Sequence, residues 1–152
     1  MKRRALSLME LILVLVLISV MAAIALPRFG GAQAHMTGLS AARRIVAEIE
    51  WIRSEAMRLQ ETKLIWFRTA LNKIDMSELE DPNHPGKSYV IELAQEMPGV
   101  KLISASFGDE PNKLRFDAWG VPEDGGDVVI GVGNETWTIN VDADTGRATI
   151  VN

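Results

Sequence analysis

Residues 5–27 read ALSLMELILVLVLISVMAAIALP, and this stretch decides how the rest of the chain is interpreted. Ser19 is the only polar side chain in the run 11–26, and Glu10 stands immediately before that run. As an α-helix, residues 6–26 would rise about 31 Å, enough to cross a hydrocarbon core of about 30 Å. The stretch therefore predicts a transmembrane helix with a carboxylate near its start.

Glu10 is unusual because an ionised carboxylate in a membrane segment costs several kcal/mol by most estimates. Such a group is by default functional and has a partner, and the alternative is a carboxylate at headgroup depth with no specific partner. Pro27 follows the apolar run directly. A proline removes a helical hydrogen bond and kinks or breaks a helix, so Pro27 either shapes this helix or simply ends the span.

The formal charge is −4 overall and is unevenly distributed. Of the 16 basic residues, Lys2, Arg3 and Arg4 precede the apolar run, so the remainder sets 13 basic against 20 acidic residues and carries −7. The leading cations keep the N-terminus cytoplasmic under the positive-inside rule. The acidic remainder argues against nucleic acid as a partner, because nucleic-acid binders present a basic face. The sequence has no cysteine and therefore no disulfide framework or thiolate metal site.

A second helical pattern begins at Leu39, where apolar residues recur at spacings of three and four. These residues are Ala42, Ile45, Ile49, Ile52, Ala56 and Leu59. Charged residues such as Arg43, Arg44, Glu48 and Glu55 occupy the rest of the helix circumference. The pattern predicts an amphipathic helix with one face packed on a sheet, and the charged side chains are left to solvent or to subunit contacts.

After Glu61 the sequence changes to short β-branched and aromatic runs separated by turn formers. We expect strands at 63–68, 88–94, 101–106, 113–117, 128–132, 136–141 and 148–151. Trp137, Ile139 and Val141 alternate with polar side chains, which indicates one solvent-facing side, as in antiparallel hairpins. The chain is therefore expected to be α+β, with a long N-terminal helix packed on an antiparallel β-sheet domain.

The leader, Glu10, the apolar run and Pro27 together resemble the N-terminal region of type IV pilins and type II secretion pseudopilins. In that family a basic leader ends at a small residue, a membrane peptidase cuts after it, and a glutamate stands four residues beyond the new N-terminus. The resemblance implies cleavage between Ala5 and Leu6, N-methylation of Leu6, and assembly roles for Glu10 and Pro27. Ala5 stands where glycine is usual, and Leu6 where phenylalanine or methionine is common, which bears on the efficiency of cleavage.

The same resemblance implies a pilin-like fold and a division of the chain into four parts. These are a prepilin leader at 1–5, a transmembrane helix at 6–27, a periplasmic amphipathic helix at 28–61 and a β-rich globular domain at 62–152. Residues 51–57, the strand around Trp66, and the segments 116–122 and 144–150 are similar to the H-type minor pseudopilin and related minor pilins.

A family member of this kind would be a non-enzymatic minor pseudopilin of a type II secretion system. It would be anchored in the bacterial inner membrane with its C-terminal domain in the periplasm, and it would need no cofactor or small-molecule substrate. The implied partners are other pseudopilins or pilins, the prepilin peptidase, the inner-membrane assembly platform and membrane lipid. Glu10 would neutralise the free α-amine of Leu6 on a neighbouring subunit.

Two other functions stay open on the sequence. A minor type IV pilin would serve pilus biogenesis or DNA uptake, and DNA uptake would need a basic patch around Arg115 and Arg147. A secreted soluble domain would use residues 1–25 as a conventional signal peptide, since Ala23-Ile24-Ala25 forms an Ala-x-Ala site and the mature chain would start at Leu26.

Four aspartates in two turns raise the question of calcium, which prefers carboxylate oxygens. They are Asp124, Asp127, Asp142 and Asp144. Asp144-Thr145-Gly146 is also an ordinary hairpin turn, and we favour that interpretation. His84 lies between two prolines and is expected in an exposed loop, and neither His84 nor His35 has neighbours in the sequence that make a catalytic constellation.

Overall fold

The computed structural model describes residues 8–151, and within 24–32 it describes the backbone alone. The chain divides between Ala34 and His35 into two compact units. Helix α1 (Leu8–Leu59) runs through both, and the second, here called the globular unit, contains every strand of the described residues. Residues 1–7, which include the predicted cleavage site between Ala5 and Leu6, lie outside the described residues.

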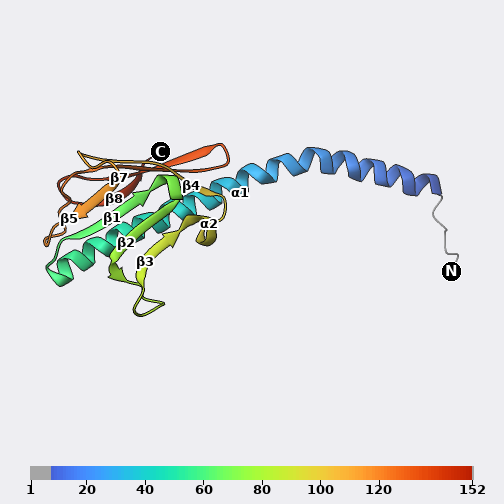
Figure 1. Ribbon diagram of the computed structural model, residues 1–152. Helices are drawn as coiled ribbons and strands as arrows, with labels where there is room; N and C mark the ends of the chain where they lie inside the picture. The colour runs from blue at the N-terminus through green and yellow to red at the C-terminus, as the bar shows by residue number, and fades with distance from the viewer. Residues whose placement is uncertain (1–7, 152) are drawn as a thin grey trace. The chain divides into compact units, whose positions relative to one another are not determined.

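The globular unit contains two four-stranded antiparallel sheets (Figure 1). The first sheet has the order β3-β2-β1-β5 and the second has the order β4-β6-β7-β8. The strands are β1 (Lys63–Arg68), β2 (Lys73–Glu80), β3 (Ser88–Glu92), β4 (Val100–Phe107), β5 (Lys113–Phe116), β6 (Gly126–Val132), β7 (Glu135–Val141) and β8 (Ala148–Val151). A 3-10 helix, η1 (Thr69–Leu71), joins β1 to β2, and a one-turn helix, α2 (Leu93–Glu96), follows β3.

The core lies between the C-terminal half of α1 and the inner faces of the sheets. The predicted helix face is buried at Ala42, Ile45, Ile49, Ile52 and Ala56, each at most 1% exposed. Leu59 departs from the prediction, since it is 38% exposed in the last turn of α1. Phe67 of the first sheet stacks on Phe107 of the second with ring centroids 5.6 Å apart, so the two sheets share one core.

Seven of the eight strands are those expected from the sequence, and β7 has the predicted alternation. Its residues Trp137, Ile139 and Val141 are buried, while the intervening side chains are partly exposed. The strand β2 was not expected, and the strands form two sheets where the sequence suggested one. Hairpin alternation identifies strands but not their pairing, because a strand of one sheet can be followed along the chain by a strand of the other.

Asn72 links the two sheets at the turn before β2. Its backbone is left-handed, with φ of 52°, a conformation that asparagine tolerates better than most residues. The side-chain oxygen accepts a hydrogen bond from the backbone N–H of Leu102 at 2.7 Å, and the amide nitrogen donates to the carbonyl of Val100 at 2.9 Å. One side chain therefore satisfies two backbone groups of β4 in the second sheet while its own backbone continues into the first.

Gly38 lets α1 approach the second sheet closely. The indole ring of Trp137 in β7 covers Gly38, and a Cβ atom built on this glycine would lie 2.1 Å from the ring. His35, one turn earlier, places its ring centroid 5.8 Å from the same indole and forms a 2.8 Å contact from Nδ1 to Glu135. The absence of a side chain at Gly38 is thus a packing requirement, although glycine is a poor helix former.

Helix α1 continues through Pro27, Gly30 and Gly31, so the helix is not broken at the proline. The apolar run and the amphipathic pattern, which are separate in the sequence, therefore belong to one helix. Among the residues described with their side chains, no helix combines the length and the apolar character that crossing a membrane requires.

Candidate assembly surfaces

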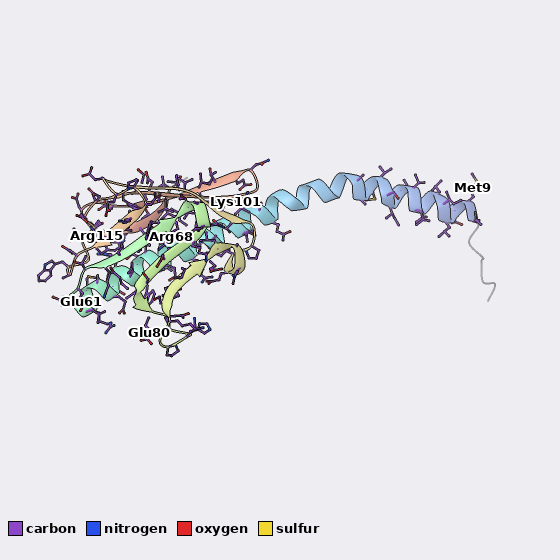
Figure 2. The ribbon with its side chains drawn as sticks, in the orientation of Figure 1. Met9, Glu61, Arg68, Glu80, Lys101 and Arg115 are labelled. Carbon is purple, nitrogen blue, oxygen red and sulfur yellow. The ribbon has the colours of Figure 1, made fainter. Side chains whose placement is uncertain are left out.

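The first turns of α1 carry apolar side chains that the chain itself does not cover. From Leu8 to Ala23 every residue is exposed, with the large apolar side chains between 43% and 77% exposed. Figure 2 shows these side chains projecting from α1 around and beyond Met9. An apolar surface on all sides of a helix is the mark of a segment that is buried in lipid or among other helices.

Glu10 lies in the first turn of α1 and is exposed. A carboxylate at this position interacts favourably with the partial positive charge at a helix N-terminus, at about 0.3–1 kcal/mol when exposed. Ser19 satisfies its own hydroxyl by donating to the carbonyl of Leu15 at 2.7 Å, so the helix can enter an apolar environment with this group paired. Glu10 is then the one ionisable side chain in the described stretch Leu8–Ala23.

The predicted assembly residues are therefore described only in part. Glu10 is placed on the exposed apolar helix, as expected. The side chain of Pro27 and both residues of the predicted cleavage site, Ala5 and Leu6, lie outside the described residues. The roles that the sequence assigns to these four residues stay predictions.

Charged residues in the C-terminal half of α1 bind the sheets of the same chain. Glu50 accepts a hydrogen bond from the backbone N–H of Ala148 in β8 at 2.9 Å, and its other oxygen pairs with Arg53 at 3.1 Å. Arg53 in turn donates from Nε to the carbonyl of Gly120 at 2.9 Å. These contacts join the helix to segments 98 and 67 residues away in sequence, so they stabilise the fold of this chain.

A second polar cluster joins α1 to the first sheet. The hydroxyl of Tyr89 in β3 donates to Glu48 at 2.9 Å, and its ring meets the edge of Trp51 at 5.1 Å between centroids and 90°. Burial and the neighbouring Glu48 carboxylate raise the pKa of Tyr89 to about 12. Arg44 pairs with Glu96 of α2 and lies 3.6 Å from Glu48. Because its pKa is raised, the phenol of Tyr89 is neutral at physiological pH and donates its hydrogen bond to Glu48.

An aromatic side chain is displayed at the end of the globular unit where α1 terminates. Trp119 is 73% exposed and sits in the turn between β5 and β6. Asp117 fixes this turn, because its Oδ1 accepts hydrogen bonds from the backbone N–H groups of Trp119 and Val121, both at 2.9 Å. Gly120 has φ of +75° and packs so tightly on Met57 of α1 that a Cβ atom would lie 2.9 Å from the Met57 sulfur.

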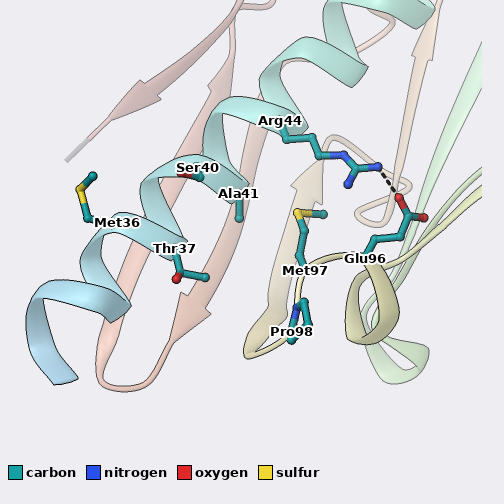
Figure 3. Close-up of a pocket in the computed structure, with 8 residues that line it drawn as sticks. All are labelled: Met36, Thr37, Ser40, Ala41, Arg44, Glu96, Met97 and Pro98. Atoms are coloured by element: carbon teal, nitrogen blue, oxygen red, sulfur yellow. Dashed lines mark hydrogen bonds and ion pairs between the residues drawn. The ribbon is translucent and has the colours of Figure 1, made fainter. Parts of the chain in front are cut away.

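An apolar groove of about 410 Å³ lies at the other end of the C-terminal half of α1. Figure 3 shows residues 36–44 of α1 on one side and Glu96, Met97 and Pro98 on the other, with the Arg44–Glu96 ion pair at one end. Met36 is 65% exposed at the opposite end. The groove is mainly apolar, and its charged residues neutralise each other.

The other candidate sites from the sequence have structural explanations. Asp142 caps the β7–β8 turn by accepting from the N–H and hydroxyl of Thr145, both at 2.7 Å, and these bonds lower the pKa of its carboxyl. Nowhere in the described part of the chain do three His, Cys, Asp or Glu side chains gather where a metal ion would fit. His84 is confirmed in an exposed loop, with its ring 2.8 Å from Asp81.

Arg115, one of the two residues on which a DNA-binding patch was considered, is neutralised by acids. Its guanidinium lies 2.7 Å from Glu123 and 3.4 Å from Glu110, and these contacts, with that to Glu123 the largest, raise its pKa above the ordinary value. A phosphate approaching Arg115 would also meet these two carboxylates. The arrangement does not favour contact with a nucleic acid.

Comparison with known proteins supports one fold. No protein-family model matches the sequence, and no curated protein matches it significantly. Two crystal structures of the type IV minor pilin FimU from Pseudomonas aeruginosa strain PAO1 superpose with TM-scores of 0.56 and 0.54, both at 13% sequence identity. The first superposition covers 76% of this chain and 88% of FimU, and the second covers 75% and 92%. The chain has a pilin-like fold.

The pilin-like fold confirms the expected architecture of a helix packed on antiparallel strands. Three features of the chain were not predicted from the sequence. They are the exposed side chain of Trp119, the groove beside Met36 and Met97, and the contact between His35 and Glu135. The sequence around Trp119 contained a usable signal, because Asp117 and Gly120 are turn-forming residues and so indicate a turn at the tryptophan between them. The other two depend on residues far apart in sequence, and no local pattern reveals them.

Proposed function

We propose that this chain is a non-enzymatic, membrane-anchored minor subunit of a pilin-like filament, and specifically a minor pseudopilin of a type II secretion system. The observation that carries the proposal is the asymmetry of α1. One half is packed on the chain's own sheets, while the other carries an uncovered apolar surface and a single carboxylate. The pilin-like fold and the leader sequence around Ala5 support the same role.

The apolar half of α1 would have two environments in this role. Before assembly, residues 6–27 span the inner membrane, with the N-terminus in the cytoplasm and the globular unit in the periplasm. After assembly, the same surface is covered by the helices of neighbouring subunits. The prepilin peptidase, the assembly platform of the inner membrane and lipid are partners in the first state, and other pseudopilins are partners in the second.

Glu10 would select the register between subunits. Cleavage after Ala5 frees the α-amine of Leu6, which is the cation that Glu10 of a neighbour neutralises. Removing one member of a buried ion pair costs about 3–5 kcal/mol because the other charge is left uncompensated. Pairing therefore favours the register that brings the two charges together as subunits leave the bilayer.

A minor type IV pilin is the second candidate, and the fold similarity to FimU favours it. The two functions share the anchor, the cleavage and the charge pair, and they differ in the machine that contains the filament. Deletion of the gene in its own host separates them. Loss of exoprotein secretion with normal surface pili supports the pseudopilin, and loss of pili with normal secretion supports the pilin.

The anchor and the charge pair are tested on the full chain expressed in membranes with a prepilin peptidase. We expect the mature protein to begin at Leu6 by intact mass, whereas a start at Leu26 would show a conventional signal peptide and overturn the anchor. Glu10→Gln should leave membrane insertion intact and abolish filament assembly, and Glu10→Asp should retain part of it. Glu61→Gln, at an exposed glutamate near the end of α1, is the matched control. Normal assembly of the Glu10→Gln protein would contradict the proposed pairing.

A further inference from the structure

The globular unit begins at His35, and the part of α1 that follows this residue buries little apolar surface. In residues 35–41, here called the entry segment, the buried residues are Gly38 and Ala41, which are both small. Each later turn of the packed helix buries a large side chain, and these are Ile45, Ile49 and Ile52. The entry segment is therefore attached to the globular unit by less apolar contact than the rest of the packed half.

The apolar groove leaves one side of the entry segment without packing. Met36, Thr37 and Ser40 line this groove of about 410 Å³, with Met97 and Pro98 on its other side (Figure 3). Side chains that line empty space have no partner atoms there and so gain little dispersion energy. A region with few buried apolar contacts opens locally at a lower free energy than the whole protein unfolds. We therefore expect the entry segment to separate more readily than the turns that follow it.

Two contacts with β7 hold the entry segment in place. The indole of Trp137 lies on Gly38 and is 2% exposed, so separation would bring a large aromatic ring into water. The ring of His35 lies 5.8 Å from the same indole between centroids, and its Nδ1 is 2.8 Å from the carboxylate of Glu135. The side chains of His35 and Glu135 are 56% and 42% exposed, so this contact is weakened by water. The indole therefore contributes most of the attachment, and the histidine adds to it.

We propose that the entry segment detaches from β7 while the rest of the packed half of α1 stays in place. A clamp holds the segment closed, and its residues are His35, Gly38, Glu135 and Trp137. In the closed state the packed helix begins at His35, and in the open state it begins at Ala42. The sheets and the buried isoleucines keep their contacts in both states, so the change is a local opening. The same globular unit thus holds two different lengths of helix. All of these residues belong to the globular unit, so the proposal does not depend on the proposed function.

Thiol labelling measures the opening, because the sequence has no cysteine of its own. Ala41→Cys places a thiol in the entry segment, and Ala56→Cys places the same group on the buried face beyond it, at sites that are 3% and 0% exposed. Each full-length protein is treated with N-ethylmaleimide in detergent micelles under native conditions. We expect the thiol at position 41 to react at least about tenfold faster than the thiol at position 56.

Changes to the clamp should accelerate labelling at position 41 and leave position 56 unchanged. Trp137→Leu should raise the rate about tenfold, because less apolar surface is exposed on opening. His35→Ala should raise it about two- to fivefold, the range expected for an exposed polar pair. His35→Gln should raise it less, since its amide can still donate to Glu135.

A matched pair of glutamates provides the control. Glu135→Gln should accelerate labelling at position 41 about as much as His35→Ala does. Glu110→Gln should have no effect there, although Glu110 is 50% exposed and pairs with Lys113 at 2.7 Å. Equal labelling of the two thiols in the unmodified background would overturn the proposal. So would equal acceleration of both thiols by a clamp substitution, because the opening would then be global. If Trp137→Leu prevents folding, the results for His35→Ala and Glu135→Gln decide.

Discussion

The two halves of α1 differ in whether their apolar side chains are buried by the same chain. Both carry rows of large aliphatic side chains that are costly to leave in water. In the C-terminal half Ile45, Ile49 and Ile52 are at most 1% exposed because the sheets of the same chain cover them. In the N-terminal half Ile12 and Ile18 are more than 50% exposed. A single helix thus contains one apolar surface that folding buries and another that stays exposed.

The polar residues of the two halves of α1 differ in the same way, in whether their partners lie in the same chain. In the C-terminal half Glu48, Glu50 and Arg53 bond to segments of the same chain. In the N-terminal half Glu10 is the single ionisable group of the described stretch, and its proposed partner belongs to another subunit. The comparison separates residues that stabilise the globular unit from residues that we propose act in association, and the following substitutions test that separation.

The largest expected effect is at the buried face. Ile52→Ala should lower the free energy of unfolding by about 2–5 kcal/mol, because it removes buried methyl groups and leaves a cavity. Ile18→Ala removes the same atoms from the exposed half and should change the stability of the globular unit by less than about 0.5 kcal/mol. Chemical denaturation of the full chain in detergent, followed by tryptophan fluorescence, measures both. Equal losses would show that the apolar half of α1 is also covered by its own chain.

A smaller effect is expected where the packed half of α1 begins. Gly38→Ala should cost about 1–3 kcal/mol, since the new methyl group meets the ring of Trp137 and the helix must move away from β7. Ser40→Ala, at an exposed position of the same helix, is the control and should be nearly neutral. In a double-mutant cycle, Trp137→Leu should reduce the cost of Gly38→Ala. An additive cycle would contradict the close approach of helix and strand.

The smallest effect concerns the polar edge of the packed half and appears only at high pH. The pKa of Tyr89 is about 12 in the folded chain against an ordinary value of 10.0, so its neutral form stabilises the fold. This contribution is complete below pH 10 and is lost as the pH rises toward 12. The melting temperature of Tyr89→Phe should therefore fall less steeply than that of the wild type between pH 10 and 12. Parallel curves would show that burial and the neighbouring Glu48 do not raise the pKa of Tyr89 in the folded chain.

The strands of the globular unit follow from local patterns wherever alternation is regular. The strands β1 and β8 have the predicted bounds, and the others differ at their ends by one or two residues. The strand β2 was not predicted, because its buried residues do not alternate regularly. Its buried residues are Ile74, Met76 and Leu79, because a bulge between Met76 and Glu80 changes the spacing from two to three. Its lysine and glutamates are also weak strand formers.

The candidate assembly surfaces also differ in how far the sequence predicts them. Glu10 stands out in the sequence because its apolar neighbours are contiguous in the chain. The turn that carries Trp119 and the groove beside Met36 do not stand out, because the contacts that define them join α1 to residues 67 and 52 positions away. The assignments to Ala5, Leu6 and Pro27 rest on resemblance alone and stay predictions. A local sequence pattern thus indicates that a segment has a surface to be buried. The residues that contact this surface are identified only in the folded structure.

The attachment of α1 to both sheets has a mechanical consequence. Contacts are spread along the helix from Gly38, under Trp137, through Glu50 at β8 to Met57 at Gly120, in the turn that carries Trp119. A tensile force along the helix axis would load all of them at once and in shear. They would have to rupture together, whereas an edge strand that is peeled away loses its bonds one at a time. The globular unit is therefore built to remain on its helix when the helix is pulled.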